Sequence, residues 1–313
     1  MKHYVDRWHT HASWQPMDAK GAQLHVLVFR ADADVIRREL CDRYLNGPLG
    51  QADRFSPLLP YVFVTVARVK SLRSQNEPYA RWGSDSEIEV AFWAPVLDHD
   101  ARGFDVFKWF VPYMFVNNPT AVQQGREIFG YPKEFAWFDP DFARTPTLPN
   151  DVTVRAYGIH TFGYGSTAGP VPVLSIAGPT PADTSPWDSF DAAASWARER
   201  LPRPAGLGTR SATLFGSLGG LLPPQGHLVF LKQFPDIANS GNACYQQVVE
   251  APVTVPPLSI RPRGGELDDY TLQLPHCDSH PIAATLGLDA SNRSIIGLWI
   301  EMDFVIEPGA PLV

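Results

Sequence analysis

Cysteine is scarce in this chain, which has three cysteines among its 313 residues: Cys41, Cys244 and Cys277. An odd and widely spaced set does not make the disulfide framework of a small secreted protein, and it fits a reducing compartment. Long apolar runs are also missing, because stretches such as PLLPYVFVTVA fall short of the roughly 18 residues that span a bilayer. The segment MKHYVDRWHTHASW has no continuous apolar core like that of a secretory signal. We therefore expect a cytoplasmic protein without a membrane partner.

Runs of basic residues are absent as well, and the net charge is −7. Nucleic-acid binding rests on a concentrated positive face, so we expect no nucleic-acid partner. The cluster HCDSH at 276–280 contains metal-ligand residue types, but no second cluster accompanies it at a recognised spacing. The glycines of FGYGSTAG do not have the spacing of a dinucleotide fingerprint. We expect neither a metal ion nor an organic cofactor.

Proline and glycine are plentiful, with 30 and 24 residues spread along the whole chain. They divide it into short segments in which β-branched or alternating apolar residues recur between turn residues. This pattern predicts a mainly β protein with strands in AQLHVLVFRA, YVFVTVARV, EIEVAFWAPV, VTVRAYGI, HLVFLKQF, QQVVEAPVTV and IIGLWIEMDFVIE.

Two segments have helical periodicity. In ADADVIRRELCDRYL, Asp32 or Asp34 is a suitable N-cap for an apolar face. In SPWDSFDAAASWARERLP, at 185–202, a serine cap and a following proline precede an apolar stripe. The glycine- and proline-rich segment at about 202–226 is predicted to be a long loop.

One lysine stands in a strongly apolar segment, GREIFGYPKEFAWF at 125–138, as Lys133. Lysine is rarely buried unless it is paired or gives up its proton. A lysine with the ordinary pKa of about 10.4 is neutral in roughly one molecule in 2,500 at neutral pH, whereas burial lowers the pKa by up to about 3 to 5 units. A buried Lys133 would therefore be an amine nucleophile. The alternative is a solvated lysine after a Gly-Tyr-Pro turn.

The segment around this lysine resembles the signature of acetoacetate decarboxylase and its relatives. The matching positions are Gly125, Arg126, Glu127, Tyr131, Pro132 and Lys133. Blocks from about residue 20 to the carboxyl end are similar as well. The resemblance implies one acetoacetate decarboxylase-like domain over 1–313, with insertions near 43–82 and 141–225. It also implies an antiparallel β barrel or cone with a few packed helices, and assembly as a homo-oligomer.

The resemblance assigns roles to four residues. Lys133 would form a Schiff base with a keto acid, and Glu89 would carry protons. Glu87 is the alternative, because side chains two apart on a strand share one face. Arg126 would orient a substrate carboxylate or brace Glu127. Tyr131 would hydrogen-bond near the imine.

The chain departs from the family at two positions. The family has a second lysine after the catalytic one, where this chain has Glu134. In an extended segment Glu134 would point to the face opposite Lys133, which limits its influence. The family also has an arginine in its first strand, where this chain has Ala22 beside Gln23. This weakens the case for acetoacetate as the substrate.

We therefore expect a Schiff-base lyase that acts on a β-keto or other oxo acid, a small molecule, through Lys133. The reaction would be decarboxylation or aldolase/dehydratase chemistry. The alternative is a non-catalytic small-molecule binding protein on the same scaffold.

Overall fold

The computed structural model describes residues 14–99, 103–179, 199, 226–256, 261–263 and 269–312. Apart from Glu199, the helix expected at 185–202 lies outside the described residues, as does nearly all of the loop expected at 202–226. The helical segments are α1 (Ala33–Val35), η1 (Ile36–Asn46), α2 (Gly47–Leu49), η2 (Tyr79–Arg81), α3 (Pro119–Gln124), η3 (Gly125–Phe129) and α6 (Ile282–Leu286).

The described strands join in a 15-stranded sheet. They are β1 (Met17–Arg30), β2 (Phe55–Pro57), β3 (Tyr61–Ser74), β4 (Asp85–His99), β5 (Asp105–Val116), β6 (Lys133–Asp139), β7 (Val152–Gly158), β8 (Gly169–Ala177), β9 (Gly226–Pro235), β10 (Ala243–Thr254), β11 (Arg261–Arg263), β12 (Thr271–Gln273), β13 (Ser291–Arg293), β14 (Ile296–Ile306) and β15 (Ala310–Pro311). The expectation of a mainly β protein is confirmed, and every strand segment expected from the sequence is present. The strands that were not expected are β5, β6 and β8 and the short strands β2, β11, β12, β13 and β15.

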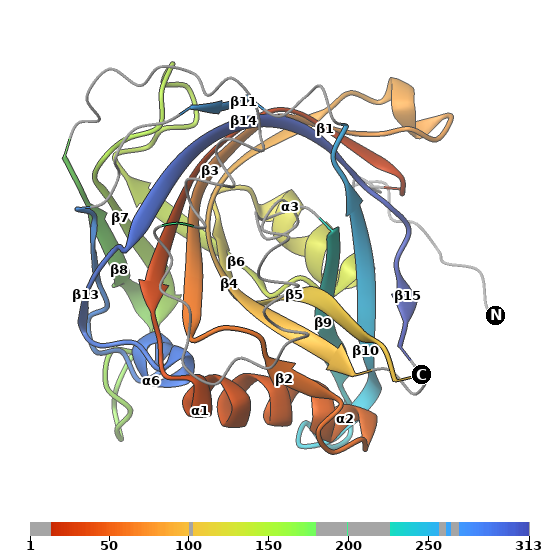
Figure 1. Ribbon diagram of the computed structural model, residues 1–313, viewed down its shortest axis with the longest axis vertical. Helices are drawn as coiled ribbons and strands as arrows, with labels where there is room; N and C mark the ends of the chain where they lie inside the picture. The colour runs from red at the N-terminus through yellow and green to blue at the C-terminus, as the bar shows by residue number, and fades with distance from the viewer. Residues whose placement is uncertain are drawn as a thin grey trace.

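The sheet curves into a ring. Strands β5, β9, β10, β14, β1, β3 and β4 are paired in that order, and β4 pairs again with β5, so the hydrogen-bonded path returns to its start (Figure 1). Most of these pairs are antiparallel, whereas β5 is parallel to both β6 and β9. Strands β6, β7, β8, β12 and β13 continue from β5 as an extension beside the ring. Closing the sheet removes exposed edges and leaves a space inside it.

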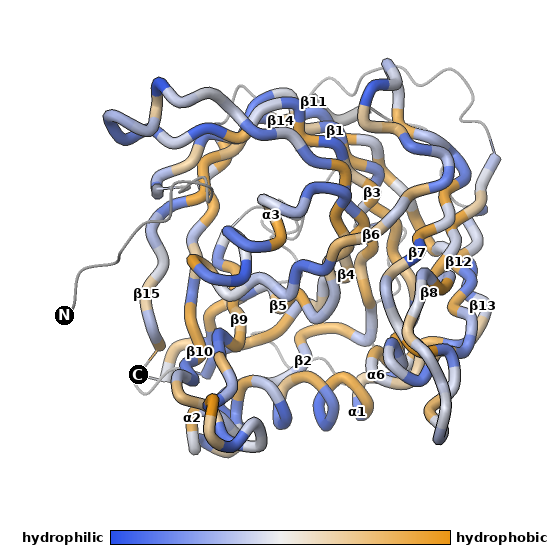
Figure 2. The backbone as a smooth tube through the Cα atoms, turned by 180° about the vertical axis from the view of Figure 1, so that it is seen from behind, coloured by the Kyte–Doolittle hydropathy of each residue, from blue (hydrophilic) through white to orange (hydrophobic). Residues whose placement is uncertain are grey.

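The ring strands carry apolar residues on both faces, and both faces are buried against other parts of the protein. One buried cluster lies inside the ring and includes Trp93, Met114 and Phe304. A second buried cluster lies on the other face of these strands. It includes Val90 and Phe92, which alternate along β4 with residues that face the inside of the ring, and Leu40 of η1. The hydropathy of the backbone shows long apolar stretches along these strands (Figure 2). Strands covered on both faces lose the simple apolar and polar alternation of a half-exposed sheet.

The helix expected in ADADVIRRELCDRYL is confirmed as α1 and η1, which run along one edge of the ring (Figure 1). The carboxylate of Asp32 accepts hydrogen bonds from the backbone N–H groups of Asp34 and Val35. This satisfies two N–H groups that a helix leaves without partners at its start. No helix in the described ranges is long and apolar enough to cross a membrane.

A second helical unit, α3 with η3, was not expected from the sequence. It lies within the outline of the ring in two opposite views (Figures 1 and 2). Asn118 caps it by accepting hydrogen bonds from Thr120 N at 2.9 Å and Ala121 N at 3.3 Å. The amide of Asn118 also donates to Asp85 Oδ1 and Ser86 O at 2.5 and 2.9 Å, which ties the helix to the start of β4. The pair Asn118-Pro119 was the available signal, because proline favours the first helical position.

We expect Asn118→Ala to lower the free energy of unfolding by about 1 to 3 kcal/mol, because it removes a helix cap and two further hydrogen bonds. Urea unfolding followed by circular dichroism measures this change. Gln123→Ala, on an exposed position of the same helix, is the control and should shift the midpoint little. An Asn118→Ala midpoint equal to that of the wild type would show that the cap contributes nothing.

Candidate functional site

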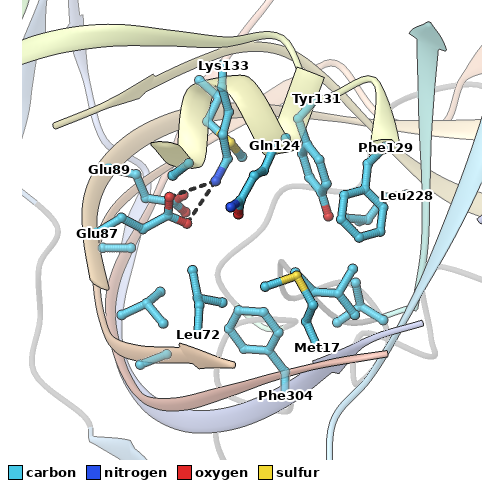
Figure 3. A pocket seen from close by; sticks show the side chains of 18 of the residues that line it. Met17, Leu72, Glu87, Glu89, Gln124, Phe129, Tyr131, Lys133, Leu228 and Phe304 are labelled. Atoms are coloured by element: carbon cyan, nitrogen blue, oxygen red, sulfur yellow. Dashed lines mark hydrogen bonds and ion pairs between the residues drawn. The ribbon is translucent and has the colours of Figure 1, made fainter. Parts of the chain in front are cut away.

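Lys133 is the first residue of β6, opposite Met114 of the parallel strand β5, and 8 % of its surface is exposed. It lines a cavity of about 70 Å³ inside the ring, which we call the inner chamber (Figure 3). This volume is space for on the order of five water-sized groups. The walls are mostly apolar and include Leu24, Leu72, Trp93, Phe129, Leu228 and Phe304. The expected burial of this lysine is therefore present.

The amine of Lys133 is paired with Glu87. Nζ donates to the two carboxylate oxygens of Glu87 at 2.7 and 2.9 Å, and both side chains are buried. Glu89 lines the same chamber from the same face of β4 (Figure 3). The sequence favoured Glu89 with Glu87 as the alternative. The structure brings both into the chamber and makes Glu87 the direct partner of the amine.

Glu89 is the carboxyl group with the strongly altered acidity. Burial, followed by the nearby charge of Glu87, raises its pKa from the ordinary 4.5 to about 7, while Lys133 acts in the opposite direction. A carboxylic acid that titrates near neutrality can both give and take a proton at physiological pH. The chamber therefore holds an amine, a carboxylate paired with it, and a carboxyl group that is half protonated near pH 7.

A glycine makes room for the lysine side chain. A Cβ on Gly125 would lie 2.7 Å from Cδ of Lys133 and 3.3 Å from its Cε. Gly125 begins η3, which is wound as a π-helix, since Gly130 N donates to Gly125 O at 3.0 Å. Gly130 then adopts a left-handed conformation, with φ of 85°, that turns the chain towards Lys133. Gly130 thus sets the path of the chain to Lys133, and Gly125 leaves room for the lysine side chain.

Tyr131 also lines the inner chamber, as expected. The amine of Lys133 lies 5.7 Å from the centre of its ring, which packs on Phe129 and Phe230. Burial, and then the charges of Glu89 and Glu87, raise the pKa of the Tyr131 hydroxyl. The hydroxyl therefore keeps its proton and can donate a hydrogen bond. Gln124, at the end of α3, reaches into the chamber next to Lys133 and was not found from the sequence (Figure 3).

Arg126 is not where the sequence analysis expected it. It is exposed and lies outside the set of described residues that line the inner chamber. The physical reason is the helical winding of η3: Gly125 faces Lys133, so the following residue is turned away from it. Glu127 is exposed as well. Arg126 is therefore not positioned to contact a substrate carboxylate in the inner chamber, contrary to the expectation from the sequence.

Glu134 points away from Lys133, as predicted for consecutive residues of a strand. Its carboxylate pairs with Nε2 of His280 at 2.8 Å, and this hydrogen bond raises the pKa of His280. Asp278, in the same HCDSH segment, accepts a hydrogen bond from Phe162 N at 2.7 Å. No group of three potential metal ligands occurs in the described part of the chain.

Ala22 lines the inner chamber and is 1 % exposed, so a small apolar side chain stands where the resemblance implied an arginine. The adjacent Gln23 is hydrogen-bonded to Glu301 at 2.9 Å and to Arg68, and it does not line this chamber. The polar residue beside Ala22 therefore does not replace the missing cation.

The raised pKa of Glu89 makes the stability of the protein depend on pH. The folded state keeps this proton up to about pH 7, whereas the unfolded chain releases it at about 4.5, so the folded state loses stability between these values as pH rises. The loss is at most about 3 kcal/mol. Glu89→Gln resembles the protonated form at every pH and lacks this loss. Its free energy of unfolding, taken relative to that of the wild type, should therefore be higher at about pH 8 than at about pH 5. Urea unfolding at both pH values measures it, and an equal difference at both would contradict the raised pKa.

Comparison with solved structures shows the same fold in several enzymes. An acetoacetate decarboxylase from Legionella pneumophila aligns with 14% identity and a TM-score of 0.60, over 99% of this chain and 92% of that chain. The enduracididine biosynthesis enzyme MppR, complexed with the condensation product of pyruvate and imidazole 4-carboxaldehyde, aligns with 13% identity and a TM-score of 0.53, over 97% and 92%. An acetoacetate decarboxylase-like enzyme from Sphingomonas wittichii RW1 aligns with 12% identity and a TM-score of 0.54, over 95% and 92%. No protein of curated function matches the sequence.

The sequence itself matches a family model. The model is described as acetoacetate decarboxylase (ADC), and it covers residues 7–169. This range contains β4 with its two glutamates, α3, η3 and the start of β6 with Lys133. The chain therefore belongs to the acetoacetate decarboxylase family.

Proposed function

We propose that this protein is a lyase in which the amine of Lys133 forms an imine with the carbonyl group of a small oxo compound, an oxo acid in the expectation from sequence. One observation carries the proposal: a buried amine lies in an apolar chamber beside a carboxylate at 2.7 Å, and a second carboxyl group, with a pKa of about 7, lines the same chamber. Nucleophile, base and acid are the groups that imine chemistry requires.

The first step needs a neutral amine. Glu87 holds Nζ with both carboxylate oxygens and is placed to take its proton. The nitrogen lone pair then adds to the carbonyl carbon, so that a C–N bond forms and the carbonyl π electrons move to oxygen. Glu89 in its acid form gives a proton to that oxygen. The carboxylate left on Glu89 then takes the second proton from nitrogen, and the adduct is a neutral carbinolamine.

The second step expels water. The hydroxyl group of the carbinolamine takes the proton held by Glu87 and leaves as water, while the nitrogen lone pair forms the C=N bond. The product is a positively charged iminium, beside which Glu87 remains as counter-ion. The hydroxyl of Tyr131 can donate a hydrogen bond to the departing oxygen. No oxidant or reductant is needed.

The iminium then accepts the electron pair of a neighbouring bond. If this bond joins the α carbon to a carboxylate, carbon dioxide leaves and an enamine remains. If a β-hydroxyl group is present, either the bond between the α and β carbons breaks to release an aldehyde, or loss of an α proton leads to expulsion of water. Relatives with this fold include an acetoacetate decarboxylase and an enzyme bound to a condensation product. Both reaction types therefore have support.

The amine is tested by reductive trapping. The protein is incubated separately with pyruvate, acetoacetate and butanone, each with cyanoborohydride, and intact masses are measured. We expect a single adduct with at least one compound, and its absence in Lys133→Met, because the variant has no amine in the chamber. Lys20→Met, at an exposed lysine, is the control and should keep the adduct.

Two outcomes would oppose the proposal. A wild-type protein without any adduct would favour a binding protein that has no reactive amine. An adduct that persists at the same level in Lys133→Met would place the reaction at another lysine.

Gly125→Ala tests the fit between the helix and the lysine. The three atoms nearest to the added methyl group would be Cδ, Cγ and Cε of Lys133, at 2.7, 3.3 and 3.3 Å, all in one flexible side chain that the methyl group would displace. We expect the free energy of unfolding to change by less than about 1 kcal/mol and the trapping rate to fall by at least about tenfold, as small displacements in reacting geometry do. Gly169→Ala, where a Cβ meets nothing within 4 Å, is the matched control. Trapping at the wild-type rate in Gly125→Ala would contradict the assigned role.

A further inference from the structure

Strand β4 presents a row of carboxyl groups to the inner chamber. Asp85, Glu87 and Glu89 follow one another at every second residue, share one face of the strand, and all line the chamber. Glu87 and Glu89 lie next to each other on the same side of Nζ of Lys133 (Figure 3). A molecule that reaches the amine therefore meets up to three negative charges.

Asp85 is the first residue of this row and lies where the inner chamber meets a second cavity. This second cavity, of about 230 Å³, adjoins the inner chamber, and we call it the outer chamber. The residues lining both chambers are Met17, Leu72, Asp85 and Gln124. Arg73 lines the outer chamber and does not line the inner one. A substrate that extended from the outer chamber into the inner one would therefore have Arg73 near its remote end and Asp85 where the two chambers meet.

The described walls of the inner chamber offer no second cation. Lys133 is the basic residue among them, and its amine already has Glu87 as a partner. Ala22 and the apolar side chains opposite β4 give a carboxylate neither charge nor hydrogen bonds, and the Tyr131 and Gln124 side chains in the lining carry no charge. A carboxylate close to the reacting carbonyl would lose its water in this space. It would also face the charge of Glu87, and that of Glu89 when Glu89 is ionised, and each of these effects opposes binding.

We propose that the substrate of this protein is a ketone or aldehyde that is uncharged around its reacting end, with no carboxylate on the reacting carbonyl or on the carbon next to it. The proposal rests on the proposed imine formation at Lys133 and narrows its substrate class. A substrate of this kind has no carboxylate to lose. The reaction is then cleavage of a carbon–carbon bond in a β-hydroxy carbonyl compound, its reverse, or elimination of water. In the cleavage, a carboxylate of the chamber takes the proton of the β-hydroxyl group as the bond breaks, and the resulting acid protonates the α carbon of the enamine. In the elimination, a carboxylate takes the α proton, and a carboxylic acid gives a proton to the hydroxyl group that leaves as water.

Acetoacetate and its methyl ester provide a matched pair, because they share one ketone and differ in the negative charge. Each is incubated with the wild type and cyanoborohydride, and the rate of adduct formation at Lys133 is measured by mass spectrometry. Adducts with and without loss of carbon dioxide are summed. Each rate is divided by that of a free lysine side chain in solution, which removes the difference in intrinsic reactivity. We expect the ester to react at least about tenfold faster, as like-charge repulsion predicts.

Asp85→Asn provides a second measurement, because it removes one negative charge where the two chambers meet. We expect it to narrow the ratio of ester to acid rates by at least about twofold. Equal or faster reaction of acetoacetate in the wild type would overturn the uncharged substrate and leave imine formation intact. Absence of both adducts at Lys133 would overturn the proposed function and this inference together. A ratio unchanged in Asp85→Asn would contradict the role of the acidic row.

Discussion

The contact between Lys133 and Glu87 is the interaction on which the site depends. A buried ammonium or a buried carboxylate alone is costly, and the two become tolerable together in an apolar chamber. The same pairing gives the amine's proton a place to go, because the acceptor is within hydrogen-bond distance at 2.7 Å. One ion pair thus accounts both for the burial of the lysine and for its proposed role as a nucleophile.

The fold supplies this pair from separate parts of the chain. Glu87 comes from β4, and Lys133 begins β6, which is held parallel to β5. Because β4 and β5 also pair and close the ring, the carboxylates and the amine face the same interior. Gly125 and the left-handed Gly130 set the path of the lysine. The chemistry of the chamber is therefore a consequence of ring closure.

Much of this arrangement could be predicted from the sequence, and the rest failed for identifiable reasons. An isolated lysine in an apolar, aromatic segment indicated the amine, and the strand alternation of EIEVAFWAPV placed two glutamates on one face. Which of them contacts the amine depends on the register of β4 against its neighbours, which the sequence does not specify. Arg126 was misplaced because its role was taken from the family resemblance, which does not show that the helical winding of η3 turns the residue after Gly125 away from Lys133. Gln124 was missed because α3 was not recognised.

The most direct test of the central claim is a crystal structure of the protein after reductive trapping with a carbonyl compound. The account predicts electron density continuous with Nζ of Lys133, directed into the inner chamber, with the carboxylate of Glu87 next to the alkylated nitrogen and Glu89 on the same side. Density on an exposed lysine such as Lys20, with Lys133 unmodified and still paired with Glu87, would contradict it.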